Sequence, residues 1–255
     1  MRRSSLAIPL ALLCMISDLG SGQTGASAAY AYEVVSVRPY KGEPHGISSR
    51  RDSFHSDVSL SNLIRFAFDV RLPEQISGIP RWADSEQYVV QAKVDEKTMA
   101  AMGKLPFQDQ MAQRRQMCVA MLGERFGLKY HNENKQVQVY ELVVAKGGPK
   151  LKKNSSAQGS HSSMGGGALK GTGITIPEIA ERLSAPAGRT IIDKTGLEGR
   201  YDVEMNWAVE DDRESDDPRP SLFEAIEEQM GLRLVSSKAL INSVVIDVLA
   251  KPSEN

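Results

Sequence analysis

The sequence predicts an α+β protein of two similar βαββ-like modules in tandem, in which short helices pack on small sheets. Amphipathic helical stretches alternate with short apolar strands along the chain, and the order of these elements recurs in its second half. The 255 residues are 41% hydrophobic and 25% charged, a composition typical of a globular protein. The formal charge of −1 gives no overall positive field, so nucleic-acid binding is not expected.

The first 28 residues have the pattern of a secretory signal peptide. Arg2 and Arg3 precede an uncharged apolar run over residues 6–16, and small residues follow with A-x-A sites at 26–28 and 29–31. The run is about half of the roughly 20 apolar residues that span a bilayer, which favours cleavage over an uncleaved anchor. We therefore expect an exported chain, periplasmic or secreted, that does not span the membrane after cleavage.

Cleavage would leave one cysteine, Cys118, so no intramolecular disulfide is expected. Its apolar neighbours, residues 117–122, favour a small buried hydrophobe, and a reactive thiol is the alternative.

The first module is expected over residues 29–151, with a strand at its N-terminus. Ser59 is placed as the N-cap of a helix whose apolar residues recur with helical spacing, at Leu60, Leu63, Ile64, Ala67 and Phe68. A turn-rich link over 75–82, a strand over 88–94 and a helix over 108–126 that ends at Gly127 follow. Two closing strands are expected over 129–131 and 137–144.

A flexible connector is expected over residues 152–173, which are rich in Gly, Ser and Lys. Its three consecutive glycines, 165–167, could cradle a phosphate, but the strand, helix and Lys-Ser/Thr pair of a phosphate loop are not apparent in the sequence around them.

The second module is expected over residues 174–255 and repeats the order of the first. Capping boxes at 175–178 and 221–224 each open a helix, and the second helix ends at Gly231. Strands are expected over 190–193, 201–207, 233–237 and 244–248.

Two pairs of segments carry the evidence for a repeat. Gly78 to Tyr88 parallels Gly196 to Tyr201, and residues 125–130 parallel residues 229–234 around a glycine. An internal duplication explains these echoes, and chance similarity within an α+β chain is the alternative.

The sequence indicates no metal or cofactor. The four histidines, at 45, 55, 131 and 161, form no H-x-H or H-x-x-x-H pair, and no C-x-x-C occurs. The acidic stretch 208–220 could gather Ca²⁺, but it lacks the spacing of a calcium loop, which favours a solvated loop.

Four motifs together resemble a large acidobacterial family of secreted proteins of unknown function, whose domain also occurs as a C-terminal extension of BlaR-type membrane metallopeptidase sensors. The motifs are Gln75 to Trp82, Leu122 to His131, Ile192 to Asp202 and Pro252 to Asn255. The resemblance covers Tyr32 to Asn255 and implies no particular chemistry. Each half also weakly resembles the short N-terminal domain of secretins and TonB-dependent receptors, which is a likeness of fold.

Six residues are candidates for ligand or partner binding. Trp82, Tyr88 and Tyr201 could line a groove between the modules, with core packing as the alternative. Arg125 contributes to a small basic patch with Lys129 and Lys135. His131 and Asp193 are the candidates for acid–base chemistry, although Asp193 precedes a turn whose backbone N–H groups an aspartate commonly accepts.

These observations predict a non-catalytic binding or sensing module of the bacterial cell envelope. Its partner would be a peptide, a cell-wall fragment or an envelope protein, bound at a sheet edge or in the groove between the modules. The alternatives are an envelope hydrolase with an unfamiliar site around His131 and Asp193, and a structural envelope component. A cleft that brings His131 and Asp193 within hydrogen-bond reach would favour the hydrolase.

Overall fold

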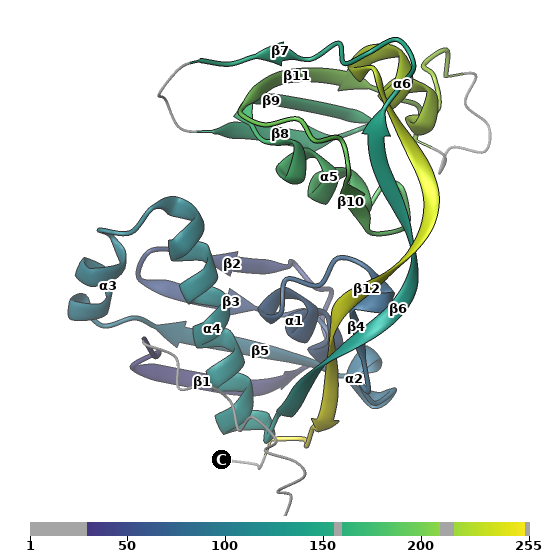
Figure 1. Ribbon diagram of the computed structural model, residues 1–255. Helices are drawn as coiled ribbons and strands as arrows, with labels where there is room; N and C mark the ends of the chain where they lie inside the picture. The colour runs from purple at the N-terminus through teal and green to yellow at the C-terminus, as the bar shows by residue number, and fades with distance from the viewer. Residues whose placement is uncertain (1–29, 156–159, 210–216, 253–255) are drawn as a thin grey trace, which may run out of the picture.

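The chain folds into two lobes joined by a long two-stranded ribbon (Figure 1). The computed structural model describes residues 30–155, 160–209 and 217–252. Within these residues the strands form three four-stranded sheets with helices packed on them, which confirms the α+β class. No helix in the described ranges is both long enough and apolar enough to cross a membrane. The predicted signal peptide, part of the acidic loop and the last three residues lie outside the described residues.

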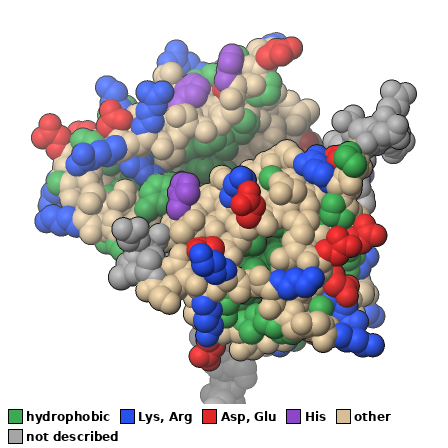
Figure 2. All heavy atoms as spheres, turned by 90° about the horizontal axis from the view of Figure 1, so that it is seen from above, with side chains coloured by type: hydrophobic (Ala, Val, Ile, Leu, Met, Phe, Trp, Pro, Cys, Tyr) green, Lys and Arg blue, Asp and Glu red, His purple; other side chains and the backbone are tan. Residues whose placement is uncertain are grey.

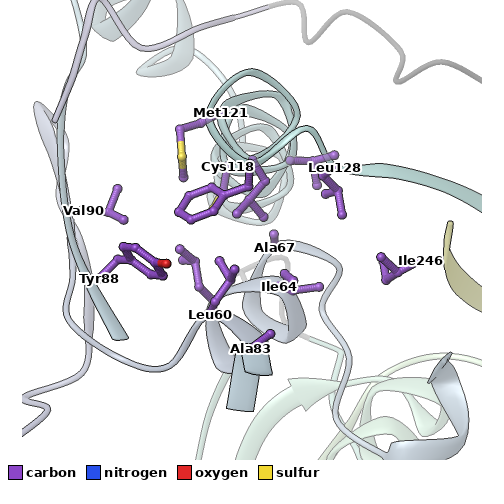
Figure 3. Close-up of a cluster of buried hydrophobic side chains, with 14 of the residues drawn as sticks. Leu60, Ile64, Ala67, Ala83, Tyr88, Val90, Cys118, Met121, Leu128 and Ile246 are labelled. Carbon is purple, nitrogen blue, oxygen red and sulfur yellow. The ribbon is translucent and has the colours of Figure 1, made fainter. Parts of the chain in front are cut away.

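The sheet of the first lobe contains four antiparallel strands, in the order β1 (Val34–Tyr40), β5 (Gln87–Lys93), β3 (Ser53–Ser56) and β2 (Ile47–Ser49). Its helices are α1 (Leu60–Ala67), α2 (Trp82–Ser85), α3 (Glu96–Met102) and α4 (Phe107–Phe126). Figure 3 shows how this core closes: Cys118 and Met121 of α4 face Leu60 of α1 and Val90 of β5. The predicted burial of Cys118 is confirmed.

Local capping residues set the start of α1 and the end of α4. The Ser59 hydroxyl accepts the N–H of Asn62 and caps α1, whose buried residues recur with helical spacing. Gly127 ends α4 in the left-handed conformation, with φ at 59°, a backbone geometry that favours glycine.

The second lobe has its own antiparallel sheet, in the order β7 (Lys152–Lys153), β11 (Tyr201–Asn206), β9 (Ala168–Ile174) and β8 (His161–Gly165). Two helices pack on it, α5 (Ile176–Ser184) and α6 (Leu222–Met230). Both predicted capping boxes are present, Thr175 with Glu178 and Ser221 with Glu224, and Gly231 ends α6.

The segment 152–173, expected to be a flexible connector, instead supplies strands to this sheet. Residues 156–159 lie outside the described residues, but β7, β8 and most of β9 fall within the segment. Leu169 of β9 is fully buried in the second core. The Ser- and Gly-rich composition did not indicate these strands, because Ser and Gly have little strand propensity of their own. The segment is ordered because it pairs with neighbouring strands of the sheet.

The closing strands of each half are single long strands, not the expected pairs of short ones. Strand β6 (Lys129–Val144) pairs antiparallel with β12 (Leu232–Val248) along almost their whole length. Gln136 lies opposite Leu240 near the middle of this ribbon. Polar residues over 132–136 suggested a break in the first strand, but these residues of β6 are all exposed, so the strand tolerates them.

The ribbon exchanges strands between the lobes. Strand β6 leaves α4 in the first lobe and ends in the second, where β10 (Ile191–Asp193) joins it in parallel. Strand β12 runs the opposite way and is joined in the first lobe by β4 (Ile76–Ser77). Ile246 of β12 is therefore part of the first core, and Leu142 of β6 is part of the second. The halves interlock through the ribbon, whereas the sequence suggested modules that simply follow each other.

Candidate ligand-binding groove

The two acid–base candidates lie far apart on β6. His131 lies opposite Val245 in the first lobe, whereas Asp193 pairs with Leu142 in the second. The eleven residues from 131 to 142 correspond to about 36 Å of strand at about 3.3 Å per residue. They share no cleft, so the geometry expected of a hydrolase site at these residues is not found.

Each of these residues has a local partner instead. The His131 ring nitrogen Nδ1 lies 2.9 Å from a carboxylate oxygen of Asp247, and both side chains are more than 40% exposed. Asp193 accepts the backbone N–H of Thr195 at 2.8 Å and its hydroxyl at 2.7 Å. Asp193 thus stabilises the turn after β10, as the sequence suggested for an aspartate at this position.

Tyr88 and Tyr201 are core residues that do not reach the space between the lobes. The hydroxyl of Tyr88 donates to Glu86 at 2.7 Å and its ring packs edge-on against Phe126. Burial, with help from that hydrogen bond, raises the pKa of Tyr88 to about 12. Tyr201 is 3% exposed and donates to the carbonyl of Glu198.

Trp82 and Arg125 also make their contacts within the first lobe. Trp82 begins α2 and packs against the first core, with the Lys251 ammonium 5.6 Å from its ring centroid. Arg125 donates to the carbonyl of Val35 at 3.1 Å and so fastens the end of α4 to β1. Lys129 and Lys135 are exposed on β6.

The structure instead brings together a set of residues that the sequence did not single out. A pocket of about 310 Å³ lies between the ribbon and the loop after α1. Its lining comes from four separate stretches of chain: Phe68, Asp69, Val70, Gln75, Gln116, Tyr130, Asn132, Asn242 and Val244.

A second pocket of about 240 Å³ adjoins the first and reaches the other lobe. The two share Asp69 and Gln75, and the second also contacts α5 and β10. Its remaining lining is Arg71, Pro177, Ala180, Glu181, Ser184, Thr190, Ile191 and Asp193. We call the two pockets together the interlobe groove. Of the six sequence candidates, Asp193 alone lines it.

A chain of ion pairs crosses the interlobe groove. Asp69 accepts from Arg115 at 2.6 Å and lies 3.8 Å from Arg71. Arg71 in turn pairs with Glu181 of α5 at 2.8 Å, which links the first lobe to the second. In the part of the chain that the structure describes, Asp69 is the only residue other than glycine with positive φ, at 54°. Asp69 is thus held in an uncommon backbone conformation at the centre of the groove.

The groove offers hydrogen bonds rather than recognisable catalytic chemistry. Among the described residues, no cluster of three His, Cys, Asp or Glu side chains could hold a metal ion. Cys118 is buried in the first core, and burial raises the pKa of its thiol to about 12. At neutral pH this thiol is protonated and out of reach of a substrate.

Seen from above, the surface carries basic and acidic side chains side by side, without a broad patch of one sign (Figure 2). This distribution agrees with the formal charge of −1.

Most of the chain matches a protein-family model. A family model described as a protein of unknown function, DUF3738, matches residues 61–249. That range contains every residue that lines the interlobe groove. Searches of curated proteins and of solved structures found no match.

Proposed function

Because the chain belongs to the DUF3738 family, described as of unknown function, we propose its role from the geometry: a non-catalytic recognition module that binds its ligand in the interlobe groove. The observation that carries this proposal is a groove lined by both lobes, at which one ion pair joins them. Concave sites between structural units are the usual place for ligands. A ligand in this groove would contact both lobes at once.

We further propose that the module acts in the bacterial cell envelope. The signal-like residues 1–28 support export, and the resemblance to the extension of BlaR-type sensors and to secretin domains supports a role in envelope recognition. The partner would then be a peptide, a cell-wall fragment or an envelope protein. Cell fractionation with N-terminal sequencing tests the location: the mature chain is expected outside the cytoplasm and to begin near Ala29. A cytoplasmic protein that keeps Met1 would contradict export.

Site-specific photocrosslinking tests the groove. A benzophenone amino acid replaces Gln116, which is exposed on α4 and lines the groove, in the full-length protein expressed in its own cells. The matched control places the same group at Lys97, which is exposed on α3 outside the groove. Capture at position 116 but not at 97, detected as an adduct by intact-protein mass spectrometry, is the expected result.

A third position separates the groove from a sheet edge. Ser163 is exposed on β8, the outer strand of the second sheet, where an extended peptide could add as a further strand. Capture at position 163 without capture at 116 would overturn the groove as the binding site. Equal capture at 116 and 97 would indicate non-specific contact and would also count against it.

A further inference from the structure

The first pocket of the interlobe groove has a floor formed by one face of the ribbon. Tyr130 lies opposite Ile246 and Asn132 opposite Val244, so these side chains share a face. Asn242 follows on the same face because it lies two residues from Val244. The floor therefore presents an aromatic ring, a small apolar surface and two amides within a volume of about 310 Å³.

The amides that line this pocket are available to a ligand. Gln116, Asn132 and Asn242 are exposed, and their side chains make no hydrogen bond with any residue that the structure describes. The side-chain oxygen of Gln75 already accepts hydrogen bonds from the backbone N–H groups of Arg71 and Leu72, so this atom is engaged within the protein. Each free amide carries both a donor and an acceptor.

Two rings supply an apolar surface beside these amides. Phe68 and Tyr130 pack edge to face, with their centroids 4.7 Å apart, and both are partly buried against the first core. This contact fixes both rings before any ligand arrives, which lowers the entropic cost of binding.

The charges at the pocket are already neutralised. Among the described residues of its lining, Asp69 is the one carboxylate, and it is paired with Arg115. None of these lining residues is lysine or arginine, and the nearby Arg71 is paired with Glu181. An anionic ligand would find no unpaired cation in this lining, and a cationic one would compete with Arg115 for Asp69.

We propose that this pocket binds a neutral sugar ring, a hexopyranose or N-acetylhexosamine unit of a glycan. The proposal rests on the recognition function assigned to the interlobe groove. A sugar hydroxyl both donates and accepts, as an amide does, so neighbouring hydroxyls match the free groups of Gln116, Asn132 and Asn242. The C–H face of the ring packs on an aromatic side chain such as Tyr130. The pocket volume is near the lower end of the range of about 300–1,000 Å³ for small-molecule sites.

An extended peptide fits this floor less well. A peptide that adds to a sheet needs an unpaired strand edge, whereas β4 already occupies the edge of β12 at Val244 and Val245. The floor is thus the face of paired strands and offers side chains rather than backbone groups.

The test measures binding of defined probes to the full mature protein by saturation-transfer NMR and titration calorimetry. The probes are triacetylchitotriose and cellotriose as neutral glycans, trigalacturonate as an anionic glycan, and trialanine as a peptide. We expect saturation transfer to at least one neutral trisaccharide and none to trigalacturonate or trialanine. Binding of trialanine or trigalacturonate in place of the neutral glycans would overturn the proposal.

Three single variants locate the site. Asn132→Ala and Asn242→Ala are each expected to weaken glycan binding about tenfold, since each removes hydrogen bonds to the ligand. Asn134→Ala is the matched control, because Asn134 lies opposite Asn242, is also exposed and is not part of the lining. Equal affinities of the three variants would place any sugar site elsewhere and overturn the proposal.

A further variant tests the aromatic contact. Phe68→Leu keeps an apolar side chain, although a smaller one, and removes a ring, and it is expected to reduce affinity while circular dichroism shows an unchanged fold. An unchanged affinity in this variant would contradict stacking at this pair of rings.

The failure of this proposal differs from that of the proposed function. If no neutral glycan binds but the probe at position 116 captures a peptide or protein, the sugar assignment is wrong and the recognition role stands. If no probe binds and position 116 captures nothing beyond the control, both are wrong.

Discussion

At two glycines, another backbone segment lies so close that a side chain would not fit. Gly78 ends β4 with φ at +79°, and its backbone lies directly against the carbonyl of Ile246 on β12. A Cβ atom at this position would overlap that carbonyl. Gly231 is similar, because its Cα faces the carbonyl of Gly148. Glycine at these positions is required both by backbone conformation and by space.

Gly78→Ala is expected to lower the free energy of unfolding by about 2 kcal/mol or more, since it adds a steric overlap to an unfavourable φ. The matched control is Gly188→Ala, which has a similar φ of +68° but open space around the new Cβ, and is expected to cost about 1 kcal/mol. Urea unfolding of both variants measures the difference. Equal losses would show that the contact with Ile246 adds nothing.

At the scale of single elements, β12 belongs to both lobes. It follows α6 in the second lobe, yet Ile246 near its end is 5% exposed within the first core. The strand therefore stabilises a core whose other fully buried residues lie between positions 54 and 128. Figure 3 shows Ile246 on the side of this cluster away from Tyr88 and Val90.

Ile246→Ala is expected to destabilise the protein by about 2–4 kcal/mol, because it removes buried methyl and methylene groups from the core. Val248→Ala on the same strand is 44% exposed and should change stability by no more than about 0.5 kcal/mol. Hydrogen exchange should then increase at Val90 in the first lobe for the Ile246 variant only. Loss of protection confined to the second lobe would contradict the assignment of β12 to the first core.

Helices α1, α4, α5 and α6 were predictable from the sequence, whereas the short helices α2 and α3 and many of the strands were not. Ser59, Thr175 and Ser221 each cap a helix with their own hydroxyl, and such local signals can be recognised without tertiary structure. Strands β2, β3, β7 and β8 are short and partly polar, and they form because neighbouring strands of the sheets pair with them, not because of their own propensity.

The candidate site was harder to predict than the fold, for a related reason. Gln75, Gln116, Asn132 and Asn242 belong to four segments and form no motif. Their common face depends on the register of β6 with β12, which the expected short strands did not reveal. The aromatic candidates Tyr88 and Tyr201 were proposed for a groove because aromatic residues suit both a core and a site, and the structure places them in the cores.

At the scale of the whole molecule, folding lowers the pKa of carboxylates in both lobes. Donors from Ser221 lower the pKa of Glu224, Thr98 lowers that of Asp95, and Lys251 lowers that of Glu86. These carboxylates are spread over both lobes. Their folded forms favour the ionised state, so each contributes stability when it is ionised.

The protein is therefore expected to lose stability in acid. Because the folded pKa values lie below the ordinary values of 3.8 for Asp and 4.5 for Glu, these contributions are fully present above those values. They are lost as the pH falls through the lowered pKa values of the folded state. Urea unfolding at pH 7, 5 and 3.5 should show little change between the first two and a marked loss at the third. A more stable protein at pH 3.5 would contradict this, and Glu224→Gln should reduce the loss.

The exchange of strands between the lobes also governs the timing of folding. Strand β4 pairs with Val244 and Val245, which lie more than 160 residues later in the chain. Domains commonly fold in the order of their synthesis. Here the strand that completes the first lobe is synthesised long after the rest of that lobe. Pairings of such large sequence separation also slow folding, because a long loop must close first. The first lobe therefore keeps part of its core uncovered until residues 244–246 have been synthesised.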